Sequence, residues 1–246
     1  MGAEFVLTPE VTNCLSTSRA QQNKVLCHEE NDPSLIGLCQ IASELKIHLL
    51  IGSLALKTHD PDGRFANRSF LIDPDGEILA RYDKIHMFDV AISETETWFE
   101  SEGYRPGSKA VLAKTNFASI GMAVCYDMRF PRLADALVNA GAQILTFPAA
   151  FSPETGAAHW HSLLRARAIE AGAWVLAPAQ TGTHQGASEK KRSTYGHSLV
   201  ISPWGEVILD AGIEAGAYLF DLDLDKVTEA RRRVPSRENA RDFEGP

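Results

Sequence analysis

Apolar residues along the chain occur either in short continuous runs or at a spacing of three to four positions. The runs are almost wholly apolar and predict a short first strand and then strands buried on both faces, at 5–7, 47–56, 118–125, 143–147 and 175–179. The spaced segments predict amphipathic helices at 34–45, 133–139 and 160–168. Strands that alternate with helices in this way are typical of an α/β fold with mixed sheets.

Two further pairs of strands each surround a turn that contains proline, and they predict hairpins. The first pairs 65–72 with 77–82, and the second pairs 198–201 with 206–209. The likeness of the two hairpins indicates two similar halves, as in two packed sheets. A last strand at 217–222 and a short helix at 225–233 follow, and the aperiodic segments are predicted as loops: 11–33, 89–107, 152–156 and 180–194. No linker interrupts the pattern, so residues 1–246 are predicted to form one domain.

Composition narrows the class of protein. With 246 residues, 44% hydrophobic and 23% charged, the chain is typical of a globular protein. A net charge of −8 argues against nucleic acid or an anionic membrane as a partner. No apolar run of about 18 residues predicts a transmembrane helix, and no secretory signal begins the chain. Four cysteines without CxxC spacing favour free thiols in a reducing, cytoplasmic environment.

Three residues at predicted strand ends suggest a reaction. Cys125 lies where a strand gives way to a helix, so nearby backbone N–H groups are expected to favour its thiolate. Glu10 follows a strand that Pro9 ends, and Lys84 ends the first hairpin. Each alone is more simply a solvated loop carboxylate or an exposed edge charge. Together they supply a nucleophile, a proton-transfer group and a cation for an oxyanion, as acyl transfer from an amide requires.

The motifs around these residues resemble those of a known family. Pro9-Glu10, the segment 82–86 and the segment 121–131 are similar, in the same order, to the Glu, Lys and Cys motifs of the nitrilase superfamily of carbon–nitrogen hydrolases. The resemblance continues through 155–160, 164–170 and 195–198, so it covers nearly the whole chain. This resemblance makes a catalytic role for Glu10 and Lys84 a better explanation than a solvated loop carboxylate and an exposed edge charge.

The resemblance implies a four-layer α-β-β-α sandwich with no metal and no organic cofactor. It implies Cys125 as the nucleophile, Glu10 as the general base and Lys84 as the oxyanion stabiliser. It adds the backbone N–H of Tyr126 as a second oxyanion donor. A second carboxylate that positions substrate and lysine maps onto Glu100, although other glutamates lie close by in the sequence.

Within the superfamily, the Cys-Tyr-Asp-Met-Arg-Phe run resembles the amidases of the Nit1 and Nit2 types, and the flanking segments resemble Nit1 more closely. Nit1 is linked to deaminated glutathione and Nit2 to α-ketoglutaramate. In this group an arginine at the position of Arg129 meets the carboxylate of the substrate, for which a bidentate pair is suited. Phe151 and Thr155 match pocket positions. A structural ion pair for Arg129 and plain loop packing for Phe151 and Thr155 stay open as alternatives.

These motifs together predict a thiol amidohydrolase. We expect it to cleave the terminal amide of a small, carboxylate-bearing substrate through a thioester and to release ammonia. The alternatives are an ω-amidase for α-ketoglutaramate-type substrates, an N-carbamoyl or aliphatic amidase, and a non-catalytic homodimeric interaction protein; a nitrile hydrolase is less favoured. The resemblance also implies a homodimer or higher homo-oligomer.

Two further features of the sequence concern a possible metal site and the start of the fold. His159 and His161 are two positions apart on a predicted helix and face different ways, which disfavours a metal site. Members of the family begin with a further strand and helix, about a tenth of the fold, whereas this chain starts almost on the strand that carries Glu10. If that piece is truly absent, a sheet edge and apolar surface are expected to be exposed.

Overall fold

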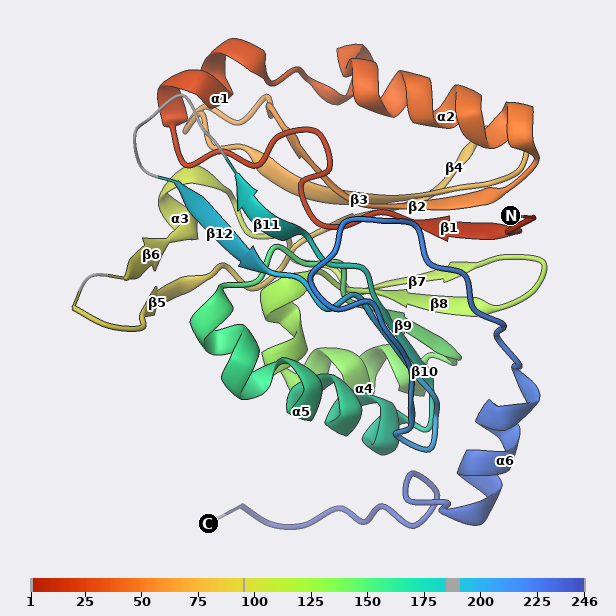
Figure 1. Ribbon diagram of the computed structural model, residues 1–246. Helices are drawn as coiled ribbons and strands as arrows, with labels where there is room; N and C mark the ends of the chain where they lie inside the picture. Colours follow the sequence, from red (N-terminus) through yellow and green to blue (C-terminus); the bar gives the residue numbers. More distant parts are fainter. Residues whose placement is uncertain (1, 95, 185–190, 246) are drawn as a thin grey trace.

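The chain folds into two packed sheets with helices on both outer faces, as Figure 1 shows for the computed structural model, which describes residues 2–94, 96–184 and 191–245. Helix α2 (Pro33–Leu45) covers the four-stranded sheet. Helices α4 (Pro131–Asn139) and α5 (Pro153–Ala171) cover the six-stranded sheet on the opposite side. The predicted α-β-β-α sandwich of mixed sheets is therefore confirmed.

The first sheet has the order β1-β2-β3-β4, and its strands are β1 (Phe5–Leu7), β2 (His48–Leu56), β3 (Ala66–Ile72) and β4 (Ile78–Asp83). Strand β1 runs parallel to β2 at the sheet edge, and the other neighbours are antiparallel. Strand β2 is buried along its whole length, as its continuous apolar run predicts. The Asp32 side chain accepts a hydrogen bond from the Leu35 N–H at 2.9 Å, so it caps α2 over this sheet.

The second sheet has the order β14-β13-β10-β9-β8-β7. Its strands are β7 (Val111–Lys114), β8 (Ser119–Met122), β9 (Ile144–Thr146), β10 (Trp174–Ala177), β13 (Leu199–Ile201) and β14 (Val207–Asp210). The central strands β8, β9 and β10 are parallel, and helices connect them. One apolar cluster joins the sheets through residues such as Leu50, Leu71, Ile120 and Leu145. The two hairpins lie in different sheets, which agrees with the two similar halves that their sequences indicate.

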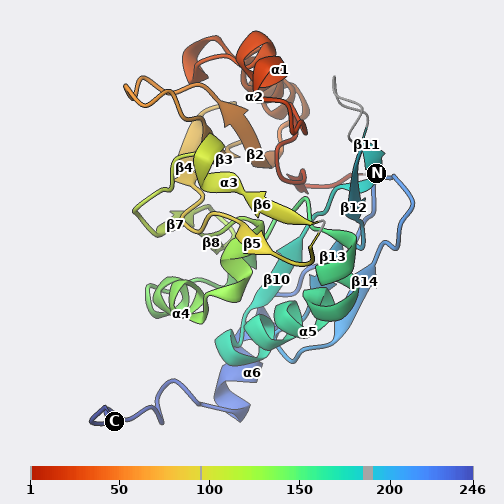
Figure 2. The same ribbon diagram turned by 90° about the vertical axis from the view of Figure 1, so that its left-hand side faces the viewer.

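Three segments predicted as loops carry regular structure instead. Residues 11–33 contain α1 (Arg19–Val25) and a 3-10 turn (Glu29–Asn31), and residues 89–107 contain β5 (Asp89–Ala91), β6 (Thr97–Phe99) and α3 (Glu100–Gly103). Residues 180–194 contain β11 (Thr181–His184) and β12 (Arg192–Tyr195), and 185–190 lie outside the described residues. These elements are short, so they contain too few positions to show the apolar period on which the prediction depends. Figures 1 and 2 show them gathered at one end of the sandwich.

Two other predictions are wrong: the start of one helix and the presence of the last strand. Helix α5 already begins at Pro153, because proline suits a first helical turn, so 152–156 is mostly helix. The predicted strand at 217–222 is irregular, and its apolar residues Tyr218 and Leu219 are exposed. A run of apolar residues forms a strand only where a sheet edge is free to pair with it. The final helix, α6 (Asp225–Arg233), agrees with its prediction.

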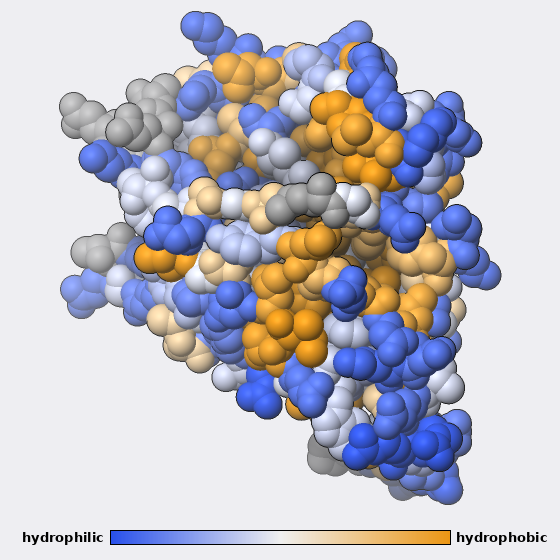
Figure 3. All heavy atoms as spheres, turned by 45° about the vertical axis from the view of Figure 1, so that its right-hand side comes forward, coloured by the Kyte–Doolittle hydropathy of each residue, from blue (hydrophilic) through white to orange (hydrophobic). Residues whose placement is uncertain are grey.

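The surface carries broad hydrophobic patches, several of which face the viewer in Figure 3. The large exposed apolar side chains come mainly from α2 and from the chain after β13, for example Ile36, Leu45, Trp204, Ile213 and Leu219. Apolar patches of this kind often mark interaction surfaces. The expected homo-oligomer stays a prediction. Among the described residues no helix is both long enough and apolar enough to cross a membrane.

Candidate active site

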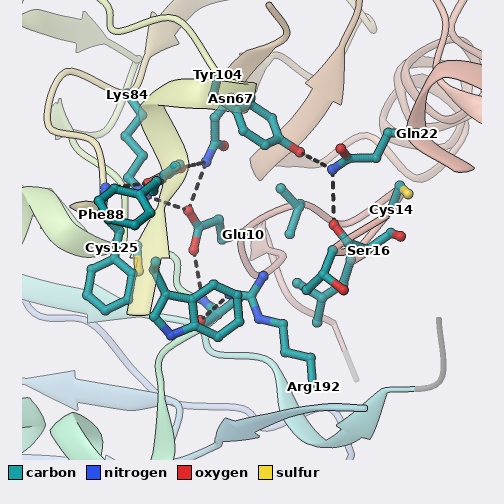
Figure 4. A pocket seen from close by; sticks show the side chains of 18 of the residues that line it. Glu10, Cys14, Ser16, Gln22, Asn67, Lys84, Phe88, Tyr104, Cys125 and Arg192 are labelled. Atoms are coloured by element: carbon teal, nitrogen blue, oxygen red, sulfur yellow. Dashed lines mark hydrogen bonds and ion pairs between the residues drawn. The ribbon is translucent and has the colours of Figure 1, made fainter. Parts of the chain in front are cut away.

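A cavity of about 340 Å³ is lined largely by residues of α1, β6, α3 and the loops next to them. Glu10, Lys84, Glu100 and Cys125 all line it, and Figure 4 labels Glu10, Lys84 and Cys125 among the lining side chains. Glu10 follows the end of β1, Lys84 follows β4, and Cys125 lies three residues beyond β8. The chain therefore brings these four residues together at the carboxyl ends of strands, where sites in α/β folds usually form.

A buried lysine joins two carboxylates in this cavity. The Lys84 Nζ lies 3.0 Å from Glu10 Oε1 and 2.8 Å from Glu100 Oε2, and the Lys84 side chain is only 2% exposed. The Asn67 amide donates to Glu10 Oε1 at 2.8 Å, and the Ala150 N–H donates to Glu10 Oε2 at 2.8 Å. Both oxygens of Glu10 are thus held in place, and each accepts from a donor that stabilises the ionised form.

The environment keeps this cluster charged. Burial alone would raise the pKa of Glu10, but the charge of Lys84 and the hydrogen bonds from Lys84 and Asn67 outweigh it and leave the pKa below its ordinary value. Burial opposes the ammonium of Lys84, but Glu10 and Glu100 outweigh it and raise the pKa of Lys84 well above its ordinary value. At neutral pH Glu10 is therefore ionised and Lys84 is protonated.

The surroundings of Cys125 raise the pKa of its thiol, whereas its place in the chain predicted that they would favour the thiolate. Burial and the negative charge of Glu10 raise the pKa of Cys125 well above its ordinary value, and Lys84 offsets them only in part. The strand also ends earlier than predicted, at Met122, and Cys125 begins a 3-10 turn that extends to Arg129. A turn this short has a weak dipole, so it gives the thiolate little stabilisation.

Unusual backbone conformations flank the cavity on both sides. Cys125 has a φ of 50° and Val11, next to Glu10, has a φ of 47°. Such angles are uncommon outside glycine and rare for a β-branched residue, and they persist only where the surroundings hold them. The Cys125 N–H donates to the Pro148 carbonyl at 2.9 Å, and the Val11 N–H donates to Ser53 Oγ at 2.8 Å. These bonds hold the nucleophilic turn and the Glu10 loop in their strained forms.

Asp127 connects the Cys125 turn to the strand end that carries Lys84. Its buried carboxylate accepts from the Val124 N–H at 2.9 Å and from the Tyr82 hydroxyl at 2.7 Å. It also accepts from the His86 N–H at 3.0 Å. Because Tyr82 and His86 lie on either side of Lys84, one carboxylate sets the position of both the thiol and the ammonium.

Comparison with known proteins places this geometry in a family. Residues 1–232 match the family described as carbon-nitrogen hydrolase, which is most of the chain. The chain belongs to the carbon-nitrogen hydrolase family. The resemblance that its motifs carry is thereby confirmed.

The relatives of this hydrolase include amidases. A deaminated glutathione amidase from Synechocystis sp. is 38% identical over 198 residues, which is 80% of this chain and 71% of that protein. The omega-amidase NIT2 of Homo sapiens is 35% identical over 236 residues, covering 95% of this chain and 82% of the human protein. The crystal structure of the Caenorhabditis elegans NitFhit protein superposes with a TM-score of 0.85 at 33% identity; the match covers 97% of this chain but spans 57% of the NitFhit chain.

Only one of the four other residues expected at the substrate lines the cavity of this hydrolase. Phe151 lines the cavity, whereas Tyr126, Arg129 and Thr155 are not among its lining residues. The Arg129 guanidinium lies 3.2 Å from His159 Nδ1, and it is 5.8 Å and 5.6 Å from the ring centres of Tyr126 and Phe151. The Thr155 hydroxyl is buried and has no hydrogen-bond partner in the described part of the chain.

Several lining residues of the hydrolase have no place in the sequence prediction, among them Asn67, Phe88, Trp98, Tyr104 and Arg192. Arg192 belongs to the segment 180–194 that the sequence predicts as a loop, yet its side chain is partly buried at the cavity. Its one signal in the sequence is that it lies three positions before Tyr195, the start of the 195–198 motif. Asn67 gives no sequence signal, because its role depends on the spatial approach of Glu10.

Potential metal ligands lie away from this cavity. The ring nitrogens of His161 and His197 and the carboxylate of Asp210 are within 4.8 Å of one another, as are donors of His28, Glu30 and His59. His161 and His197 each contact Asp210 at 2.9 Å, the length of a hydrogen bond. His159 contacts Arg129, not His161, so these two histidines do not share a ligand site. The lining of the cavity offers the thiols of Cys14 and Cys125, the Lys84 ammonium, and the carboxylates of Glu10 and Glu100, which contact Lys84.

Proposed function

We propose that the chain is a thiol amidase that cleaves an amide of a small, carboxylate-bearing molecule through a thioester on Cys125. The observation that supports it best is the buried ion cluster of Glu10, Lys84 and Glu100 in one cavity with Cys125. A purely structural role does not explain two carboxylates and an ammonium buried beside a thiol, because burial of charge costs free energy. This weighs against the non-catalytic alternative.

In the first half-reaction the Glu10 carboxylate takes the proton of the Cys125 thiol, and Sγ attacks the amide carbonyl carbon. The negative charge moves to the carbonyl oxygen, where the Lys84 ammonium and the Tyr126 N–H are the proposed donors. The tetrahedral intermediate then collapses, the carbon–nitrogen bond breaks, and Glu10 returns its proton to the departing nitrogen. An amine or ammonia leaves, and the acyl group stays on sulfur as a thioester.

In the second half-reaction Glu10, again ionised, takes a proton from a water molecule that attacks the thioester carbonyl. The carbon–sulfur bond breaks, the thiol of Cys125 regains a proton, and the carboxylic acid product departs. Glu100 holds Lys84 through contacts of 2.8 Å and 3.0 Å, so we assign it a positioning role. The whole cycle consumes one water and changes no oxidation state.

The names of the relatives support the substrate class but leave two members of it open. An ω-amide is a primary amide and releases ammonia, whereas the amides of deaminated glutathione are N-substituted and release an amine. A cavity of about 340 Å³ suits small ligands of either kind. The released product therefore distinguishes the two, and the original expectation of ammonia holds only for the ω-amide.

The purified chain should hydrolyse carboxylate-bearing amides and no nitriles. The panel is the half-amide of glutaric acid, N-glutarylglycine, an N-carbamoyl amino acid, propionamide and propionitrile. Ammonia and free primary amine are measured separately. Turnover of the first two compounds supports the proposal, and the faster one gives the subclass. A folded chain, checked by circular dichroism, that cleaves none of the amides would favour the non-catalytic alternative.

The activity should depend little on pH over a wide range. Glu10 must be ionised, and its pKa lies below the ordinary 4.5, so the acidic limb of kcat/KM is expected below that pH. Lys84 must stay protonated, and its pKa lies well above 10.5. A plateau from about pH 5 to 9 follows from general-base catalysis. A rate that climbs about tenfold per pH unit from 6 to 9 would instead show that the free thiolate, not the Glu10–thiol pair, is the reactant.

A further inference from the structure

Arg192 reaches the cavity from a segment outside the catalytic motifs. It is the first residue of β12, and Figure 4 shows its side chain pointing toward the region around Glu10. Its Nη2 donates to the Ala150 carbonyl at 2.9 Å, and the N–H of the same Ala150 donates to Glu10 Oε2 at 2.8 Å. One residue therefore separates the guanidinium from the proposed general base.

The Arg192 guanidinium has unused hydrogen-bonding capacity. Its centre lies 5.2 Å from the centre of the Trp98 ring, which holds the guanidinium by a cation–π contact. A guanidinium carries five N–H donors, and the bond to Ala150 uses one nitrogen. Across residues 2–94, 96–184 and 191–245, no carboxylate comes within ion-pair distance of Arg192. An anchored cation with free donors is suited to bind a carboxylate in two-pronged fashion.

The other cationic side chains near the cavity already contact protein groups. Lys84 contacts both Glu10 and Glu100. Arg19 donates to the carbonyls of Gly103 and Gly63 and lies over the Phe65 ring at 3.7 Å. Arg129, the arginine that the resemblance assigns to the substrate, contacts His159 and does not line the cavity. Among the described lining residues Arg192 therefore has the most capacity for an anion.

We propose that Arg192 is the carboxylate-binding subsite of this hydrolase, and the proposal rests on the amidase function above. The substrate places its amide carbonyl at Cys125 and Lys84 and its carboxylate at the Arg192 guanidinium. Glu10, Glu100 and Glu102 also line the cavity, so an unpaired anionic substrate would be repelled. Arg192 offsets that repulsion and selects acids over neutral amides.

The test compares an acid with its neutral twin. The half-amide of glutaric acid and the methyl ester of that half-amide carry the same scissile amide, and only the first bears a carboxylate. In Arg192→Gln, KM for the acid should rise about 10- to 100-fold, the effect of losing a charge-assisted bidentate pair. For the ester KM should change less than about threefold, and kcat for both compounds should stay within a few-fold. Arg192→Lys should recover part of the lost affinity.

A control variant removes the same charge elsewhere. Arg232 is exposed on α6, and Arg232→Gln should leave both substrates unaffected. A merely structural role of Arg192 would harm acid and ester alike. Equal losses for the two substrates, or a selective loss for the acid in Arg129→Gln but not in Arg192→Gln, would overturn the proposal.

A binding measurement separates the subsite from the reaction. Glutarate, which has no amide, is titrated by calorimetry into Cys125→Ala and into the double variant Cys125→Ala/Arg192→Gln. Tighter binding to the single variant by about tenfold or more supports the subsite even if no amide is turned over. Equal binding to both variants contradicts it, even if the amidase function holds.

Discussion

Replacing Cys125 with alanine should lower kcat for amide hydrolysis by about 10⁴-fold or more, because members of a catalytic unit lose nearly all activity when the nucleophile is removed. The cavity keeps its shape, since the Cys125 side chain is small and the turn is held by Asp127 and Pro148. Steady-state rates on the best substrate of the panel check the loss. Mass spectrometry of acid-quenched mixtures should show an acyl adduct on the wild-type chain and none on the variant.

The chain offers both a competitor and a control for this assignment. Cys14 also lines the cavity, and burial raises the pKa of its thiol. Cys39 lies on α2, outside the cavity lining, and Cys39→Ala should keep wild-type rates and the adduct. An adduct mapped to Cys14, or activity of Cys125→Ala within tenfold of the wild type, would refute Cys125 as the nucleophile.

Lys84→Met should both abolish activity and destabilise the fold by about 3–5 kcal/mol at pH 7. The substitution leaves the buried carboxylates of Glu10 and Glu100 without their cation, which costs far more than the lost attraction itself. The free energy of unfolding from urea titrations measures the effect. The matched control is Lys46→Met, because Lys46 pairs with Asp75 at 3.1 Å on the surface, both side chains being more than 60% exposed. That pair should contribute no more than about 1 kcal/mol.

The free energy of unfolding should change with pH in opposite directions in the wild type and in Lys84→Met. In the wild type the pKa of Glu10 is below its unfolded value, so its contribution is present above pH 4.5 and is lost as the pH falls through the folded pKa. Without Lys84, burial dominates and raises the pKa of Glu10, so Lys84→Met should gain stability as the pH falls from 7 toward 5. Adding Glu10→Gln and Glu100→Gln should restore part of the loss. If Lys84→Met is no more destabilising than Lys46→Met, the buried cluster does not carry the stability assigned to it.

Patterns of short range account for what the sequence predicted well. Helix α2 and strand β2 follow from apolar period and from burial on both faces, which are visible within a dozen residues. The ribbons β5–β6 and β11–β12 are missed because strands of three or four residues are too short to show a period, and their pairing depends on the elements around them. The segment 217–222 fails in the opposite way, since it has the pattern of a strand but pairs with no strand in the described part of the chain.

In the candidate site, too, local motifs were visible in the sequence and contacts between distant residues were not. Its motifs made Glu10, Lys84 and Cys125 identifiable from the sequence, and Glu100 followed from the resemblance. The support of those residues was not identifiable, because Asn67 reaches Glu10 across 57 positions and Ala150 reaches it across 140. The amino-acid sequence alone therefore determined the family, the layered fold and the candidate reacting groups of this protein. Only the tertiary structure decided that burial and Glu10 raise the pKa of Cys125, that Arg129 lies outside the cavity lining and that Arg192 lies within it. The reason is that pKa values and ligand pockets depend on burial and on charges brought together from distant parts of the chain.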